Sequence, residues 1–188
     1  MKSTRRTAVV LLSGGLDSAT CLALAFRDGF ECHALTFDYG QRHKIEVECA
    51  ARVASSVGAA SHTVYTLDVT PFAGSSLATG GDVPKDGREP GASGVPSTYV
   101  PARNLVFLSI AAAYAETLGG SDVYIGVNAV DYSGYPDCRP AFVRAFAQAA
   151  TLATRRGTEG NQPLNIHAPL LELSKADIVR SAAACDVD

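Results

Sequence analysis

Residues 7–18 read TAVVLLSGGLDS, an apolar run that passes without a break into a polar turn with two glycines. The run 7–12 is short, apolar and bounded by a turn, which predicts a buried strand. The stretch 17–28 is predicted to be a helix that ends at Gly29. A strand and a helix joined through glycines indicate an α/β unit whose turn can approach a ligand closely.

The same alternation continues along the chain. Further strands are predicted at 31–37, 62–67, 122–127 and 165–167, and further helices at 41–57, 104–118, 140–156 and from Ser174 onward. Ser174 is an N-cap candidate because Asp177 follows three residues later. The alternation predicts an α/β fold with a doubly wound, mainly parallel sheet of five strands and helices on both faces. Ligands bind such sheets outside the carboxyl ends of the strands, which directs attention to the turns after the first, second and fourth strands.

The composition suits a single domain spanning residues 1–188, with 47% hydrophobic residues, 19% charged residues and a net charge of −3. Acidic and basic residues are interleaved, which argues against direct binding of nucleic acid through an extended basic face. The apolar runs are too short to span a membrane and the start does not resemble a signal peptide, so we expect a cytoplasmic protein. The five cysteines include no CxxC pair, so neither a disulfide framework nor a zinc site is expected from this chain alone.

The segment 69–101 differs from the rest of the chain because it is rich in Gly, Pro, Ser and Thr. A loop of this length inside a compact domain is usually either functional or disordered. We interpret it as a candidate lid over the ligand site, which would exclude water during a reaction.

The turn at residues 13–18 has the composition of an anion site. Its two glycines remove side-chain bulk, and the helix that follows offers unpaired N–H groups and the positive end of its dipole. Asp17 is the unexpected member, because a carboxylate repels phosphates; it either faces Mg²⁺ or serves as the helix N-cap. The turn contains neither GxGxxG nor GK[ST], and an ordinary strand-to-helix turn remains the alternative interpretation.

The hexapeptide SGGLDS at residues 13–18 resembles the pyrophosphatase loop of the N-type ATP pyrophosphatases, which have the adenine nucleotide alpha-hydrolase-like fold. The resemblance implies a loop that grips the pyrophosphate released when ATP adenylates a substrate. It also implies a catalytic set of Asp17, Arg103 and Lys175, in which Asp17 helps to hold Mg²⁺ and the other two contact phosphates. The implied ATP site comprises Leu12, Ser13, Gly14, Gly15, Leu16, Asp17, Ser18, Phe37, Arg103 and Lys175, with Phe37 packed on adenine.

Three further segments narrow the resemblance. They are TFDYGQRH at 36–43, YVPARN at 99–104 and GVNAVDYSGYPDCR at 126–139, and with SGGLDS they resemble the 7-cyano-7-deazaguanine synthase family of queuosine biosynthesis, a tRNA modification pathway. The resemblance implies an ATP-dependent ligase that converts 7-carboxy-7-deazaguanine and ammonia to the nitrile through an adenylated carboxylate and an adenylated amide. It also implies a homodimer and a zinc segment whose ligands would follow residue 188. That C-terminal appendage is not part of this chain, which is either a fragment or a naturally short version.

Two groups of polar and aromatic residues are candidates for substrate binding. The first group follows the fourth predicted strand, and a carboxylate there can accept two N–H groups of a guanine-like edge; its members are Asp131, Ser133, Tyr135 and Asp137. A turn stabilised by Asp and Ser bonds to the backbone is the alternative for this group. The second group lies at the start of the helix 41–57 and comprises Tyr39, Gln41 and Arg42, with a solvated helix terminus as its alternative.

Two other functions remain open at this point. One is a different ATP pyrophosphatase of the same superfamily, such as a tRNA-modifying enzyme or an amidotransferase synthetase. Enzymes of that class that thiolate tRNA generally need a reactive pair of cysteines. No two cysteines of this chain have the required spacing, which argues against a thiolating enzyme. The other is an ATP-binding module without turnover.

Overall fold

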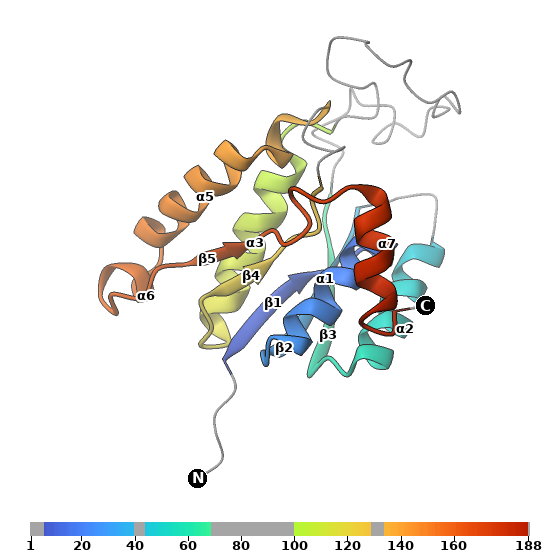
Figure 1. The fold of residues 1–188 in the computed structure, drawn as a ribbon. Helices are drawn as coiled ribbons and strands as arrows, with labels where there is room; N and C mark the ends of the chain where they lie inside the picture. Colours follow the sequence, from blue (N-terminus) through green and yellow to red (C-terminus); the bar gives the residue numbers. More distant parts are fainter. Residues whose placement is uncertain (1–5, 40–43, 69–99, 129–133, 188) are drawn as a thin grey trace.

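The structure is a computed structural model that describes residues 6–39, 44–68, 100–128 and 134–187. Its centre is a sheet in which the described strands follow the order β3-β2-β1-β4-β5 (Figure 1). All four neighbouring pairs are parallel. The strands are β1 (Thr7–Leu11), β2 (Glu31–Asp38), β3 (Ser61–Thr66), β4 (Asp122–Tyr124) and β5 (Asn165–His167). The predicted doubly wound parallel sheet is thereby confirmed.

Helices cover both faces of the sheet. One face packs against α1 (Leu16–Arg27), α2 (Lys44–Val57) and α7 (Lys175–Ala183), and the other against α3 (Arg103–Thr117) and α5 (Pro140–Ala153). Two short helices, η2 (Pro136–Cys138) and α6 (Arg155–Thr158), flank α5. Within the described ranges, no helix combines the length and the apolar character that a membrane span requires.

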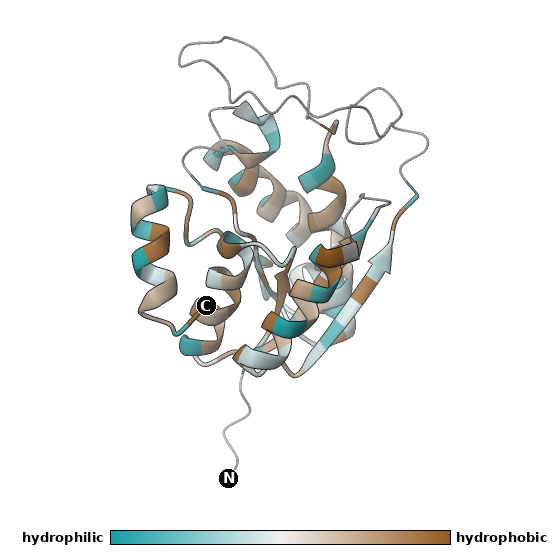
Figure 2. Ribbon diagram, turned by 90° about the vertical axis from the view of Figure 1, so that its right-hand side faces the viewer, coloured by the Kyte–Doolittle hydropathy of each residue, from teal (hydrophilic) through white to brown (hydrophobic). Residues whose placement is uncertain are grey.

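The central strand explains why residues 8–12 are apolar throughout. Ala8 and Val10 face the α1 layer, Val9 and Leu11 face the α3 layer, and all four are buried. A parallel strand that is covered on both faces has no solvent side, so its sequence does not alternate. In Figure 2 the hydrophobic segments accordingly gather between the helix layers, whereas the edge strand β3 mixes hydrophilic and hydrophobic residues.

Two predicted elements differ from the structure. The strand predicted at 122–127 ends at Tyr124, because pairing with β1 stops at Val10 and the chain then turns toward α1. The helix predicted at 140–156 is interrupted at Thr154, whose φ of −108° and ψ of 146° are extended, so α6 is a separate turn. The helix predicted at 41–57 spans Lys44–Val57 in the structure, and the remaining elements agree with their predicted positions to within one residue.

Candidate functional site

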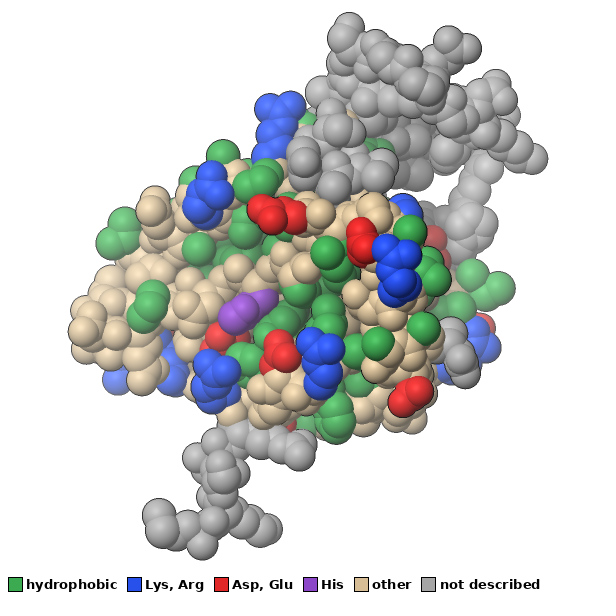
Figure 3. Space-filling view, in the orientation of Figure 1, with side chains coloured by type: hydrophobic (Ala, Val, Ile, Leu, Met, Phe, Trp, Pro, Cys, Tyr) green, Lys and Arg blue, Asp and Glu red, His purple; other side chains and the backbone are tan. Residues whose placement is uncertain are grey.

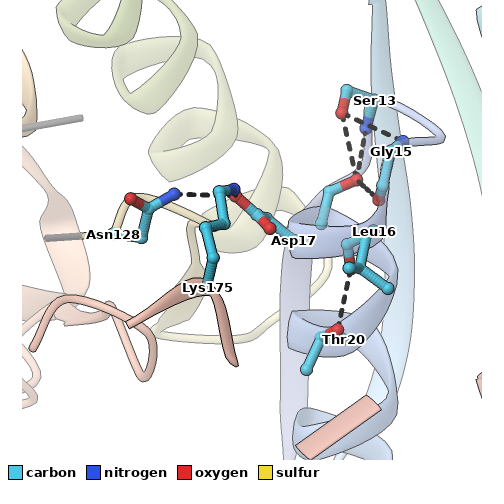
Figure 4. Close-up of polar contacts among 8 residues, drawn as sticks. Ser13, Gly15, Leu16, Asp17, Thr20, Asn128 and Lys175 are labelled. Atoms are coloured by element: carbon cyan, nitrogen blue, oxygen red, sulfur yellow. Dashed lines mark hydrogen bonds and ion pairs between the residues drawn. The ribbon is translucent and has the colours of Figure 1, made fainter. Parts of the chain in front are cut away.

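The turn between β1 and α1 is closed by its own serine side chains. Ser18 Oγ donates to the carbonyl oxygen of Gly15 at 2.9 Å and accepts from the N–H of Ser13 at 3.1 Å. Ser13 Oγ lies 3.0 Å from the same hydroxyl (Figure 4). Gly14 has a φ of +86°, and a Cβ there would lie 2.5 Å from the carbonyl oxygen of Glu46 on α2. The turn is therefore preorganised, and it leads into a helix N-terminus suited to anions.

Asp17 is not the N-cap of α1, so that interpretation was wrong. The helix begins at Leu16, its N-cap is Gly15, and no side chain caps it. The carboxylate points instead toward two distant residues: its Oδ2 accepts from Asn128 Nδ2 at 2.7 Å and from Lys175 Nζ at 2.6 Å (Figure 4). The structure thus brings together the predicted residues Asp17 and Lys175.

Lys175 reaches Asp17 because α7 is fixed at both ends of its first turn. Ser174 and Asp177 form the capping box that the sequence predicts, with the Ser174 Oγ accepting from the Asp177 N–H at 3.2 Å. Ile178 is fully buried against the α1 layer. A lysine at a helix N-terminus opposes the dipole, and the Asp17 carboxylate offsets that unfavourable interaction. The ion pair also holds the starts of α1 and α7 together.

Arg103 is the first residue of α3, and this helix start is capped from elsewhere in the chain. Oδ2 of the buried Asp137 accepts the N–H of Asn104 at 2.8 Å. The Asn104 amide in turn donates to the Asp137 carbonyl oxygen at 3.4 Å and contacts Cys138 Sγ at 3.1 Å. Ala102, just before the helix, is left-handed with a φ of 55°. Asp137 therefore joins η2 to the helix that carries Arg103.

A small pocket lies beside the start of α3. Its lining includes the predicted residues Tyr39 and Arg103, and the full set is Tyr39, Leu67, Val100, Pro101, Arg103, Val106 and Phe107. Phe37 stacks on Phe107 with ring centroids 4.0 Å apart and planes within 2°. One face of the Phe37 ring is therefore covered by protein, and its contact with adenine stays a prediction.

Four of the predicted residues cannot be placed. Gln41, Arg42, Asp131 and Ser133 lie outside the described residues, as does most of the candidate lid at 69–101. Of the same two predicted groups, the structure places Tyr39 beside the pocket and Tyr135 next to η2. The substrate roles of all these residues remain predictions.

Asn128 and Gly126 contribute to the site although sequence reasoning assigned them no role. Asn128 is fully buried, and a Cβ on Gly126 would lie 3.2 Å from backbone atoms of Asp17 and Ser18. Their position in the sequence could have indicated a role, because both residues follow a short buried strand at the carboxyl edge of the sheet, where ligands bind. The contact of Asn128 with a residue 111 positions earlier is not visible in any local pattern.

Titratable groups away from the turn have structural partners. Burial alone would raise the pKa of Asp122, but hydrogen bonds from His167 and Asn165, with the charges of His167 and Arg6, bring that pKa below its ordinary value. His167 Nε2 lies 2.7 Å from Asp122 Oδ1. Burial, and to a lesser extent the charge of Asp17, raises the pKa of the Cys21 thiol.

Three histidines in the described part of the chain have polar partners. His33 meets Ser61 at 2.8 Å, His62 meets Thr36 at 2.8 Å, and His167 pairs with Asp122. Among the residues that the structure describes, no group of three or more His, Cys, Asp or Glu side chains is arranged to hold a metal ion. On the face shown in Figure 3, basic side chains lie among acidic and apolar ones.

Solved structures share this fold at low sequence identity. A predicted subunit of tRNA methyltransferase from Methanocaldococcus jannaschii matches with a TM-score of 0.60 and 17% identity, covering 95% of this chain and 74% of that one. An NMN synthetase from Francisella tularensis matches with a TM-score of 0.56 and 18% identity, covering 98% and 63%. At these identities the likeness concerns the fold alone.

Sequence relatives are much closer. A 7-cyano-7-deazaguanine synthase from Anaeromyxobacter sp. (strain Fw109-5) is 59% identical over 189 residues, which cover 99% of this chain and 80% of that protein. Another from Dechloromonas aromatica (strain RCB) is 56% identical over 184 residues, covering 97% and 80%. The model of the family "Queuosine biosynthesis protein QueC" matches residues 7–188. The chain therefore belongs to the QueC family of queuosine biosynthesis proteins.

Proposed function

We propose that this chain is an ATP-dependent ligase that converts 7-carboxy-7-deazaguanine and ammonia to 7-cyano-7-deazaguanine. The observation that carries the proposal is the closed turn after β1, with Asp17 joined to Lys175, in a chain 59% identical to a protein that bears this activity in its name. An anion site at a helix N-terminus is the feature that an ATP-cleaving enzyme of this fold requires.

The reaction explains why a phosphate site is needed twice. A carboxylate is a poor electrophile, because oxide would have to leave; adenylation by ATP releases pyrophosphate and makes AMP the leaving group. Ammonia attacks the acyl carbon, expels AMP and loses a proton, which gives the amide. A second ATP adenylates the amide oxygen, and loss of AMP and protons then leaves the nitrile. One pyrophosphate-gripping turn serves both activations.

Each predicted site residue has a role in this reaction. The N–H groups at the start of α1, with Ser13 and Ser18, hold the pyrophosphate portion of ATP. Arg103 and Lys175 neutralise phosphate charge, Arg103 through its planar fork and Lys175 as a point charge. Asp131, Ser133, Tyr135 and Asp137 bind the deazapurine, and Asp137 also joins η2 to α3.

The site fits Mg²⁺ but the described residues offer no zinc site. Mg²⁺ that accompanies a nucleotide takes one or two carboxylates together with phosphate oxygens and water, and Asp17 supplies a carboxylate in the first turn of α1. When bound there, Mg²⁺ neutralises charge that develops on the pyrophosphate. For zinc, the described part of the chain contains no cluster of ligands, so we assign it no step.

The test is to incubate the chain with ATP, Mg²⁺, ammonium and 7-carboxy-7-deazaguanine, and to detect AMP and the nitrile by mass spectrometry. We expect both products, and their loss in Asp17→Asn. Glu159→Gln is a matched control, because that carboxylate pairs with Arg155 on exposed α6. ATP binding without AMP release would instead favour a binding module, and AMP formed without nitrile would favour another ATP pyrophosphatase.

A further inference from the structure

Asn128 places a polar side chain in a position where the protein interior is otherwise apolar. The residue is completely buried, and its neighbour Val127 belongs to the apolar core on the α3 side. A buried amide is unfavourable unless it is hydrogen-bonded, so the partner it chooses is informative. One partner is Asp17, whose Oδ2 accepts from the amide at 2.7 Å (Figure 4).

Asp17 Oδ2 receives a second donor that differs from the first in mobility. Lys175 Nζ lies 2.6 Å away, but the Lys175 side chain is 57% exposed and has a flexible four-carbon stem. Asn128 is short and has no exposed surface. The lysine can therefore leave the carboxylate without disturbing the core, whereas the asparagine cannot.

The segment that carries Asn128 is fitted to α1 at two further points. Gly126 approaches the backbone of Asp17 so closely that a Cβ would lie 3.2 Å from its carbonyl carbon and oxygen. The carbonyl oxygen of Ile125 accepts a weak hydrogen bond from Cys21 Sγ at 3.6 Å. These contacts fix the distance between the two backbones, and so they fix the reach of the Asn128 amide to the carboxylate.

We propose that Asn128 is a positioning residue that keeps Asp17 directed at the metal–nucleotide site while Lys175 moves from this carboxylate to the phosphates of ATP. The inference rests on the proposed ATP site. A metal ion that binds Asp17 repels the ammonium group of Lys175, and the triphosphate of ATP attracts that group. Both interactions therefore favour movement of the Lys175 ammonium group from Asp17 to the phosphates. A neutral amide donor is compatible with the carboxylate before and after that transfer.

The experiment measures ATP binding by calorimetry with Mg²⁺ and again in EDTA, for the native chain, Asn128→Leu and Lys175→Met. Leucine has the same number of side-chain heavy atoms as asparagine and the same branching at Cγ, but it is bulkier and donates no hydrogen bond. For each protein, the ratio of ATP affinity with Mg²⁺ to ATP affinity in EDTA measures the effect of Mg²⁺. We expect this ratio to be about 10- to 100-fold smaller in Asn128→Leu than in the native chain, the range typical of residues that orient a metal ligand. Its affinity in EDTA should stay near native. Lys175→Met should show the reverse pattern, with weaker binding in EDTA and the Mg²⁺ effect retained.

A purely structural role would lower the melting temperature without changing the ratio of the two affinities, and that outcome would overturn the proposal. Asn128→Ser provides the same comparison if the leucine variant does not fold. In the background of Asp17→Asn, adding Asn128→Leu should change the Mg²⁺ effect no further, since the partner is already altered. No heterocyclic acid is present in this assay. A native chain that binds ATP without any Mg²⁺ effect therefore refutes this inference alone, and a missing nitrile product refutes only the proposed function.

Discussion

Replacing Gly14 by alanine tests how closely α2 covers the turn at residues 13–18. The added Cβ would lie 2.5 Å from the carbonyl oxygen of Glu46 and 2.9 Å from the backbone nitrogen of Ala50. Both are backbone atoms of a helix, so neither can rotate away, and α2 or the turn must shift. Gly14 also has a φ of +86°, where a side chain is strained.

Two contributions set the expected loss of stability. Left-handed strain amounts to about 1–2 kcal/mol, and overpacking adds about 1–3 kcal/mol. Gly14→Ala should therefore lower the free energy of unfolding by about 2–5 kcal/mol. Gly29→Ala is the matched control, because Gly29 has the same φ of +86° and no atom within 4 Å of the added Cβ. It should show the strain alone, about 1–2 kcal/mol.

Urea unfolding of the three proteins provides the comparison, since a shift in midpoint at constant slope reports stability. ATP binding should weaken in Gly14→Ala, because the turn is displaced, and should stay native in Gly29→Ala. If the two variants lose the same free energy, or if Gly14→Ala binds ATP as the native chain does, then α2 does not confine this turn and the reasoning fails.

Two further substitutions test buried carboxylates. Asp137→Asn keeps an oxygen for the N–H of Asn104 but removes the charge at the N-terminus of α3, so we expect a loss of about 0.3–1 kcal/mol without ligand; an unchanged urea midpoint would argue against the cap. Asp122→Asn should cost about 1–3 kcal/mol near neutral pH, because it removes the charged partner of His167. Since folding lowers the pKa of Asp122, its stabilisation is fully present above the ordinary value of 3.8 and is lost as the pH falls through the lower folded value. The gap between native and variant should thus narrow below about pH 4, and a gap that urea titrations find constant at all pH values would contradict this assignment.

Features encoded by neighbouring residues could be predicted from the sequence. The capping box of α7 is such a feature, because Ser174 and Asp177 are three positions apart and their types alone specify it. Strand β1 is another, because an apolar run bounded by glycines has few other structures open to it. The doubly wound parallel sheet followed in the same way from the alternation of short apolar runs and helical stretches, whereas the order of its strands did not.

Features that depend on tertiary contacts could not be predicted. Asp17 lies in a helix start where the local rules allow an N-cap, but the helix begins earlier and the carboxylate bonds to residues 111 and 158 positions away. Asp137 is a candidate turn or substrate residue by sequence, and its cap on a helix start 33 positions earlier could not be predicted from local pattern. Periodicity and motif spacing report which residues share a face, and they contain no information on which two faces meet.

The order of the strands has a consequence for how the protein is made. Strand β1 occupies the centre of the sheet although it is synthesised first, and its neighbour β4 emerges only after β2 and β3. Domains generally fold as the chain leaves the ribosome, N-terminal parts first. The Asp17–Lys175 pair, separated by 158 positions, can close only when almost all of the described chain has emerged. A nascent polypeptide consequently displays the turn at residues 13–18 long before Lys175 arrives, and the ion pair that joins α1 to α7 is among the last contacts to form.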